Sequence, residues 1–306
     1  MAKVFIDGGA GTTGLRIVER LEGRKDIELI RLPDELRKDA DARRQAINSA
    51  DVAFLCLPDA AAVEAVAMVD NPNTVIIDTS TAHRTASGWT YGFPELCGRE
   101  AVKASKRIAN PGCHASGFVA LVKPLVDRGI ISNDALLTCF SITGYSGGGK
   151  SMIAEYGAEG RDRLLDAPRQ YGLTQQHKHL KEIQALCSLN NAPAFCPIVA
   201  DFYSGMEVTV TLFKSEINGS ADDIKAIYKE LYTGDIVKYV DEAAEGGFMS
   251  AAAMSGSDSM EISVGGNEDR ILLVSRFDNL GKGASGSAIQ NMNIVLGVDE
   301  STGLDL

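Results

Sequence analysis

The stretch "KVFIDGGAGTTG", residues 3–14, decides how the N-terminal half of this chain folds. An apolar run ends in a glycine-rich turn, in which Gly8, Gly11 and Gly14 have the spacing G-x-x-G-x-x-G, and a helical pattern follows. Strand, glycine turn and helix in this order are typical of a dinucleotide site, because glycines let a pyrophosphate approach the helix N-terminus closely. The spacing differs from the standard G-x-G-x-x-G, so a tight turn that binds nothing is the alternative.

The same alternation of apolar runs and helical patterns continues through residues 3–110. Apolar runs lie at 3–9, 26–32, 51–58 and 74–80, and helical patterns lie near 12–23, 39–49 and 60–69. We expect the first helix to bury a stripe formed by Leu15, Val18 and Leu21. Such alternation predicts βαβ units, and nearly continuous apolar strands predict a parallel sheet covered on both faces.

The second half of the chain has a different pattern. Alternating strands are predicted at "LLTCFSITG" (136–144), "EVTVTLF" (207–213), "MEISVGG" (260–266) and "RILLVSRFDN" (270–279), with helices near 221–233 and 283–297. We therefore predict an α/β protein of two domains, which suits 306 residues. A Rossmann-type domain covers 1–112 and is completed by a terminal helix in 283–306, and an α+β domain with a largely antiparallel sheet covers 113–282.

Composition excludes several classes of protein. The chain has 30 basic and 41 acidic residues and a net charge of −11, so binding to nucleic acid or an anionic membrane is not expected. The N-terminus lacks a signal-peptide pattern and no apolar run spans a bilayer, which predicts a cytoplasmic protein. Six scattered cysteines without a C-x-x-C pair indicate neither a disulfide framework nor a metal site.

One cysteine differs from the others in its surroundings. Cys113 lies in "NPGCHA" (110–115), at a predicted strand-to-helix junction, where the helix dipole and backbone N–H groups favour a thiolate or an oxyanion. The alternative is a buried thiol that only packs. A nucleophile needs an acid–base partner, and "QHKHLKEI" (176–183) supplies His177 and His179.

Two further patterns concern phosphate groups. "GYSGGGKS" (144–151) fits the phosphate-loop template G-x-x-x-x-G-K-[ST], which would make the chain an ATPase. However, Gly157 and Gly160 interrupt the helix that an ATP loop requires, although "PIVAD", ending at Asp201, could supply the partner strand. At the end of the second strand, Arg31 favours NADP over NAD, since an arginine there accommodates a 2′-phosphate.

Eight blocks in order resemble the shorter form of the N-acetyl-γ-glutamyl-phosphate reductases, relatives of aspartate-semialdehyde dehydrogenase. They cover nearly the whole chain: "GGAGTTGLRI", "FLCLPD", "DTSTAHR", "YGFPEL", "NPGCHA", "TGYSGGGK", "HKHLKEI" and "DNLGKGASGSAIQNMN". Lys181 stands where the longer form has proline, which puts the local backbone shape in doubt but not the two histidines.

The resemblance implies that Cys113 attacks N-acetylglutamyl phosphate, and that the thioester is reduced with NADPH to N-acetylglutamate semialdehyde. It implies an acid–base role for His177 or His179, of which we favour His179. The implied NADP(H) contacts are Gly8, Gly11, Thr12, Thr13, Gly14, Arg31, Pro58, Ser80, Asn279, Lys282, Gly283 and Ala284. The predicted substrate contacts are Asn110, Tyr145, Ser146, Gly147, Lys150 and Arg84, although Arg84 could instead hold its loop together with Glu95. That Lys150 and the glycine loop hold the substrate phosphate is our own hypothesis, and Tyr145, Ser146 and Gly147 could bind the substrate chain instead.

The resemblance also suggests a homodimer or homotetramer that takes a small acyl-phosphate substrate. Three rival functions stay open at this point. Another semialdehyde dehydrogenase would keep Cys113 and the glycine turn, a non-catalytic NADP-binding regulator would not need the cysteine, and an ATPase would need Mg²⁺ and Lys150.

Overall fold

The computed structural model describes all 306 residues and divides the chain into two compact units. Unit 1 contains Met1–Pro111 and Ala284–Leu304, and unit 2 contains Gly112–Gly283 and Asp305–Leu306. The predicted domain boundaries differ by one residue from the two points at which the chain passes between the units, after residues 111 and 283. The last two residues belong to unit 2 and not, as predicted, to unit 1.

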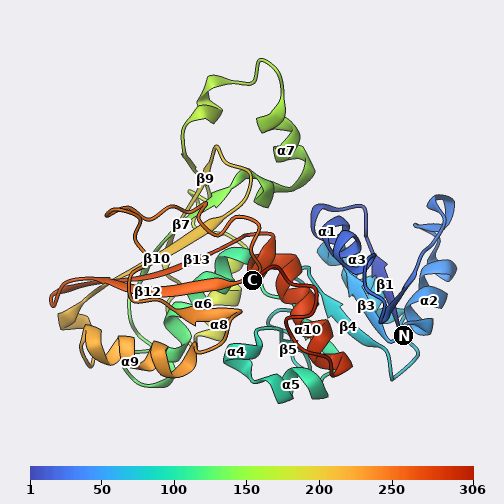
Figure 1. Cartoon of the computed structure of the whole chain (residues 1–306), viewed down its shortest axis with the longest axis horizontal. Coiled ribbons are helices and arrows are strands. Elements are labelled where there is room, and N and C mark those ends of the chain that lie inside the picture. The colour runs from blue at the N-terminus through green and yellow to red at the C-terminus, as the bar shows by residue number, and fades with distance from the viewer. The chain divides into compact units, whose positions relative to one another are not determined.

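Unit 1 is built on a six-stranded, fully parallel sheet in the order β2-β1-β3-β4-β6-β5 (Figure 1). The strands are β1 (Ala2–Asp7), β2 (Ile27–Ile30), β3 (Val52–Leu55), β4 (Val75–Asp78), β5 (Thr90–Tyr91) and β6 (Arg107–Ala109). β3 and β4 are buried at every position, which is the expected consequence of helices on both faces. The predicted parallel α/β domain is confirmed.

The helices of unit 1 cover both faces of this sheet. They are α1 (Thr12–Leu21), α2 (Ala40–Ser49), α3 (Asp59–Ala67), α4 (Pro94–Cys97), α5 (Arg99–Ala104) and α10 (Gly286–Leu296), with a short 3₁₀ turn, η1 (Asp34–Leu36). Apolar side chains of α1, α5 and α10 pack on one face, and those of α2 and α3 pack on the other. The terminal helix α10 thus completes the core that β1 begins.

The glycine turn between β1 and α1 is closely packed. Gly8 has a φ of 85°, and a Cβ there would lie 2.3 Å from the carbonyl oxygen of Cys56. A Cβ on Gly14 would lie 2.6 Å from the carbonyl oxygen of Gly8. This contact turns the Gly14 face of α1 inward, with Ile17 and Leu21 buried beside it. The predicted stripe was therefore wrong at Leu15, which is 44% exposed.

Unit 2 is built on a seven-stranded mixed sheet in the order β11-β12-β13-β10-β7-β9-β8. The strands are β7 (Thr138–Gly144), β8 (Arg169–Gln170), β9 (Ala194–Ala200), β10 (Met206–Phe213), β11 (Val237–Tyr239), β12 (Met260–Gly266) and β13 (Arg270–Phe277). Pairing is antiparallel except for β7 with β9 and β11 with β12. The predicted α+β domain with a largely antiparallel sheet is confirmed.

Helix α6 (Cys113–Asp127) is the central helix of unit 2. It packs on β10 and β13 and is flanked by α8 (His179–Leu186) and α9 (Ala221–Leu231). The other helical segments are α7 (Gly149–Gly157), the 3₁₀ turns η2 (Tyr145–Gly148), η3 (Arg163–Asp166) and η4 (Lys214–Glu216), and a π-helical turn, η5 (Gly281–Ser285). Because two strands and two helices pack against it, α6 is buried on nearly all sides. The chain contains no helix with the length and apolar character to cross a bilayer.

Replacing Gly14 by alanine should destabilise the protein, although alanine is the better helix former by about 1 kcal/mol. The added methyl group collides with the backbone of Gly8, and such overpacking costs about 1–3 kcal/mol. Urea denaturation of Gly14→Ala measures the loss. Gly23→Ala is the matched control, because nothing lies within 4 Å of its Cβ. Equal stability of Gly14→Ala and wild type would contradict the packing argument.

Candidate active site in unit 2

Cys113 is the first residue of α6, and its side chain is half-buried. The preceding residue, Gly112, has extended backbone and donates its N–H to the Oε1 of Glu182 at 2.8 Å. On the other side, a Cβ placed on Gly283 would lie only 3.1 Å from the Cβ of Cys113. The backbone on either side of the thiol is therefore fixed by specific contacts.

Glu182 was not predicted as a site residue. It lies three residues after His179 in α8, which places both side chains on one helix face, and it is 2% exposed. The sequence signal was the glutamate of "HKHLKEI", but its partner, a backbone N–H, cannot be read from the sequence.

Three histidines gather beside Cys113. The ring centroid of His114 lies 5.7 Å from that of His177 and 5.5 Å from that of His179, and the latter two are 4.9 Å apart. His114 follows Cys113 in α6, whereas His179 begins α8 and His177 precedes it. The structure thus brings the predicted histidine pair next to the segment that contains Cys113, although Cys113 and His177 are 64 positions apart in the sequence.

Both ring nitrogens of His114 are engaged by hydroxyl groups. Nδ1 lies 2.6 Å from the Oγ of Ser141, and Nε2 lies 2.7 Å from the hydroxyl of Tyr171. Burial lowers the pKa of His114 to about 3, and the charges of His177 and Lys178 add to this. His114 is therefore neutral at physiological pH and has no ring nitrogen left for proton transfer to a substrate.

The predicted pair, His177 and His179, differ in their surroundings. His179 is 4% exposed, whereas His177 is half-buried and accepts the backbone N–H of His179 on its Nδ1 at 3.3 Å. Burial lowers the pKa of His177, and the neighbouring charge of Lys178 lowers it further. Because this bond uses the lone pair of Nδ1, the single proton of a neutral His177 lies on Nε2, which is therefore a donor and not a base.

Tyr171 is a second residue that sequence reasoning missed. Burial raises the pKa of its hydroxyl above the usual range, and the charge of nearby Cys113 raises it further. The side chain also packs against a small apolar cluster that contains Tyr156, Leu165 and Val199. No local pattern marks this tyrosine, because the partner of its hydroxyl, His114, lies on α6, distant in the sequence.

The glycine loop at 144–151 forms the 3₁₀ turn η2 and the start of α7. Ser146 is buried and accepts a hydrogen bond from the Nδ2 of Asn279 at 3.0 Å, while Tyr145 stacks on Tyr156 at a centroid distance of 4.7 Å. Gly147 and Lys150 are exposed. The loop therefore presents glycine backbone and one lysine to solvent, as an anion-holding segment would.

The features that an ATP loop needs are partly present. The segment "PIVAD" lies at the end of β9, and β9 pairs in parallel with β7, the strand that leads into the glycine loop. The largely antiparallel sheet predicted for this domain is therefore parallel at this point. However, α7 ends at Gly157, and the carboxylate of Asp201 forms an ion pair with Arg161. That ion pair occupies the acidic group that an ATPase would offer to Mg²⁺.

Three predicted cofactor contacts of unit 2 lie near the π-helical turn η5. Asn279 precedes the turn, and Lys282 and Gly283 lie in it. Asn279 accepts the N–H of Gly205 at 2.9 Å, and Lys282 is 1% exposed. Gly283 is the residue that packs on Cys113, as described above. π-Helical turns are frequent at functional sites, which is compatible with the predicted role of this segment.

The glycine turn of unit 1 fits the pyrophosphate of a dinucleotide. The N-cap of α1 is Gly11, with no side-chain cap, and the first turn, which includes Thr12 and Thr13, carries no acidic residue. The helix N-terminus therefore leaves its N–H groups for an anion, as the positive end of the helix dipole favours. Pro58, the N-cap of α3, follows β3 in the same unit, while Ser80 after β4 donates its hydroxyl to Asp78 at 2.7 Å.

Three predicted residues of unit 1 have well-defined partners. Arg31 is exposed and pairs with the exposed Glu22 at 2.5 Å, a contact of the kind that contributes little stability. Arg84 donates to the carbonyl oxygens of Asn110 and Thr79, each at 3.0 Å, so it holds its loop to the end of β6. Asn110 in turn donates its Nδ2 to the carbonyl of Ala284 at 2.9 Å.

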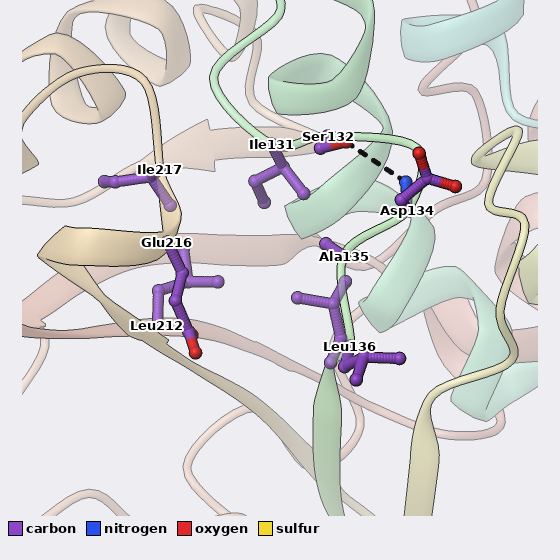
Figure 2. Close-up of a pocket in the computed structure, with 9 residues that line it drawn as sticks. Ile131, Ser132, Asp134, Ala135, Leu136, Leu212, Glu216 and Ile217 are labelled. Carbon is purple, nitrogen blue, oxygen red and sulfur yellow. Dashed lines mark hydrogen bonds between the residues drawn. The ribbon is translucent and has the colours of Figure 1, made fainter.

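A separate cavity of about 290 Å³ lies in unit 2, beside the start of β7 and the end of β10 (Figure 2). Its walls are Ile131, Ser132, Asp134, Ala135, Leu136, Leu137, Leu212, Glu216 and Ile217. No cysteine or histidine lines it, and the N–H of Asp134 donates to Ser132 within it. The cavity thus offers neither a thiol nor an imidazole, and the cysteine and histidines described above lie elsewhere.

Comparison with known proteins identifies the family. The chain matches the semialdehyde dehydrogenase NAD-binding domain over residues 3–105 and the semialdehyde dehydrogenase dimerisation domain over residues 113–279. It is 43% identical to N-acetyl-gamma-glutamyl-phosphate reductase 2 of Nostoc sp. over 99% of both chains. The chain belongs to the N-acetyl-γ-glutamyl-phosphate reductase family. Its similarity to the Brucella ovis reductase, 44% identical over 96% of this chain and 99% of the relative, agrees with that assignment.

Solved structures related to this reductase family have the same fold. Aspartate semialdehyde dehydrogenase II of Vibrio cholerae gives a TM-score of 0.72 at 17% identity and covers 97% of this chain and 98% of its own. Aspartate semialdehyde dehydrogenase from Francisella tularensis gives a TM-score of 0.71 at 14% identity, and the match covers 97% of this chain and 100% of that enzyme. The family is one of oxidoreductases with a nicotinamide dinucleotide domain, as the sequence predicted.

The neutral state of His114 should make stability depend on pH. Its folded pKa of about 3 lies below the ordinary 6.5, so the unfolded chain takes up a proton first as the pH falls. Stability is fully present above pH 6.5 and should fall by about 1 kcal/mol between pH 6.5 and 5.5 from this group. Urea denaturation at both pH values should show a smaller fall for His114→Asn. Equal falls in both proteins would refute the assignment.

Proposed function

We propose that this chain reduces N-acetyl-L-glutamyl 5-phosphate with NADPH to N-acetyl-L-glutamate 5-semialdehyde and phosphate, a step of arginine biosynthesis. The observation that carries the proposal is the half-buried Cys113 at the start of α6, grouped in one unit with His177 and His179. The identity of 43% over 99% of the chain to a protein named for this reaction supports the choice of substrate.

The chemistry assigns a role to each group of unit 2. A histidine of the pair, which we propose is His179, takes the thiol proton of Cys113 as the sulfur attacks the acyl carbon. The bond from that carbon to the phosphate oxygen breaks, phosphate leaves and a thioester forms on Cys113. NADPH, when bound, supplies the hydride that reduces this carbon. The carbon–sulfur bond then breaks, which releases the aldehyde and restores the thiolate.

The cofactor proposal rests on unit 1. Gly8, Gly11 and Gly14 would hold the pyrophosphate at the N-terminus of α1, and the family's dinucleotide domain supports this. Arg31 follows β2 and has an exposed guanidinium, so we assign it to the 2′-phosphate that distinguishes NADPH from NADH. Its pairing with exposed Glu22 is weak enough for a phosphate to replace.

We assign the acyl phosphate to the loop at 144–151. The exposed Gly147 and Lys150 would hold the phosphate, and Tyr145 and Ser146 would shape the loop. Asn110 and Arg84, whose hydrogen bonds hold the end of β6, would position the backbone around the substrate. An ATPase is less well supported, because α7 is short and Asp201 is paired with Arg161.

We also propose that the chain forms a homodimer or homotetramer through the sheet of unit 2. Phe140 of β7 and Leu272 of β13 are 42% and 39% exposed, and the matching family model is named a dimerisation domain. Exposed apolar side chains on a sheet face are typical of a surface that another copy covers.

Replacing Cys113 by alanine should abolish turnover in the reverse reaction, because no thioester can form. The assay mixes NADP⁺, phosphate and N-acetylglutamate semialdehyde and follows NADPH absorbance. Cys196→Ala, which changes another half-buried cysteine, should keep wild-type activity. In the same assay His179→Asn should lose more activity than His177→Asn. Turnover by Cys113→Ala, or a preference for aspartate semialdehyde, would reject the proposed reaction.

Replacing Arg31 by alanine should raise the KM for NADPH about tenfold, which corresponds to about 1.4 kcal/mol of lost phosphate binding. The KM for NADH should stay unchanged, because NADH lacks the 2′-phosphate. Glu22→Ala is the control, since it removes the partner of Arg31 and keeps the arginine. A uniform rise for both cofactors would show that Arg31 does not read the 2′-phosphate.

A further inference from the structure

A buried ion pair of unit 1 lies directly before the glycine turn. Asp7 is the last residue of β1 and is 4% exposed. Its Oδ2 accepts hydrogen bonds from Nε of Arg43 at 3.1 Å and from Nη2 at 2.8 Å, and Nε also lies 3.3 Å from Oδ1. The side chain of Arg43 is 11% exposed. Two nitrogens of this nearly buried guanidinium are thus fixed on a buried carboxylate.

Arg43 keeps donors that this pairing does not use. A guanidinium has five N–H groups in a planar fork, and Asp7 takes the N–H of Nε and one N–H of Nη2. Nη1 makes no hydrogen bond within the protein. The free N–H groups of Nη1 and Nη2 form a second fork, of the kind that binds two oxygens of a phosphate. Donors with so little access to water favour a bound partner.

The place of Arg43 in the fold suits a phosphate of the dinucleotide. β1 lies between β2 and β3, so the chain changes direction at its carboxyl end, where ligands of such sheets bind. The segment after the second strand is the one that reads the ribose 2′ position. Arg43 is the fourth residue of α2, which follows β2 and packs on β1 (Figure 1). It therefore joins the 2′-reading segment to the end of β1.

The pair also settles the charge beside the glycine turn. Asp7 stands one residue before Gly8, close to where a pyrophosphate would bind, and an unpaired carboxylate would repel it. Arg43 compensates this charge. The carboxylate in turn holds the guanidinium in one orientation, which a flexible arginine at the surface lacks.

We propose that Arg43, held by Asp7, donates its free N–H groups to the 2′-phosphate of NADPH. This role rests on the proposed function and deepens its choice of cofactor by adding a fixed arginine to the exposed Arg31. Arg31 has to leave Glu22 to bind a phosphate, whereas Arg43 is already in place and loses little side-chain freedom on binding. Asp7 is a positioning residue, because it acts on the phosphate through Arg43.

The test measures binding to the protein without cofactor by isothermal titration calorimetry. One ligand is 2′,5′-ADP, which carries the 2′-phosphate, and the other is 5′-ADP, which carries only the pyrophosphate. Because Arg43→Met alone leaves a buried carboxylate unpaired, the variant tested is Asp7→Asn/Arg43→Met, and Asp7→Asn is its reference. Loss of Arg43 should weaken binding of 2′,5′-ADP about tenfold and leave that of 5′-ADP within about twofold. NADPH should weaken like 2′,5′-ADP, and NADH should not change.

Arg44→Met is the matched control. Arg44 follows Arg43 in α2, and its guanidinium is 49% exposed and pairs with Asp70. The variant removes the same charge without touching Asp7, so both ligands should bind as they do to the wild type. Urea denaturation checks that every variant folds.

Two results would overturn the role of Arg43. Weakening of 5′-ADP as strong as that of 2′,5′-ADP would place the guanidinium at the pyrophosphate, and unchanged binding of both ligands would exclude Arg43 from the cofactor site. A wild type that binds NADH as tightly as NADPH would instead reject the cofactor of the proposed function.

Discussion

The hydrogen bond between Ser141 and His114 is the contact on which the organisation of unit 2 depends. It joins the first turn of α6 to β7, the strand that pairs with β10 on one side and β9 on the other. Since α6 also packs on β10 and β13, the helix N-terminus has little freedom to move relative to the sheet. The Glu182 carboxylate holds the residue before Cys113 from the opposite side. The nucleophile that we propose, Cys113, would when held in this way not have to be ordered as a substrate arrives, which would save part of the entropy cost of reaction.

The sequence was sufficient to predict the architecture of both units. Apolar runs that alternate with helical patterns led to the parallel sheet, and the alternating runs at 260–266 and 270–279 led to the antiparallel strands β12 and β13. The miss at Leu15 has a simple cause. Periodicity gives the spacing of a buried stripe but not its rotation, which here is set by the backbone contact between Gly14 and Gly8. That contact is made by residues without side chains, so hydrophobicity could not reveal it.

Residues of the candidate site could be predicted only where the residue type and its neighbours in the sequence single it out. Cys113 follows a Pro-Gly break, and His177 and His179 form a conspicuous pair, so both could be found from residue type and position. Ser141, Tyr171 and Glu182 could not be predicted as a group. Each acts on a residue from another element, and a serine, a tyrosine or a glutamate is common in strands, loops and helices alike. Lys150 shows the opposite limit, because a perfect match to the phosphate-loop template there leaves its role open between binding ATP and binding a substrate phosphate.

The chain passes into unit 2 at residue 112 and returns to unit 1 at residue 284, so α10, which completes the core of unit 1, is made after nearly all of unit 2. Ala288, Ile289 and Met292 of α10 belong to the same apolar core as Val4 and Ile17 of the first strand and helix. During synthesis the first 111 residues therefore emerge from the ribosome with one face of their sheet still lacking this helix. Unit 2, apart from its last two residues, is contiguous and can be completed first. The core of unit 1 can therefore be completed only after α10 is made, and until then a nascent dinucleotide domain must keep an apolar face from aggregating.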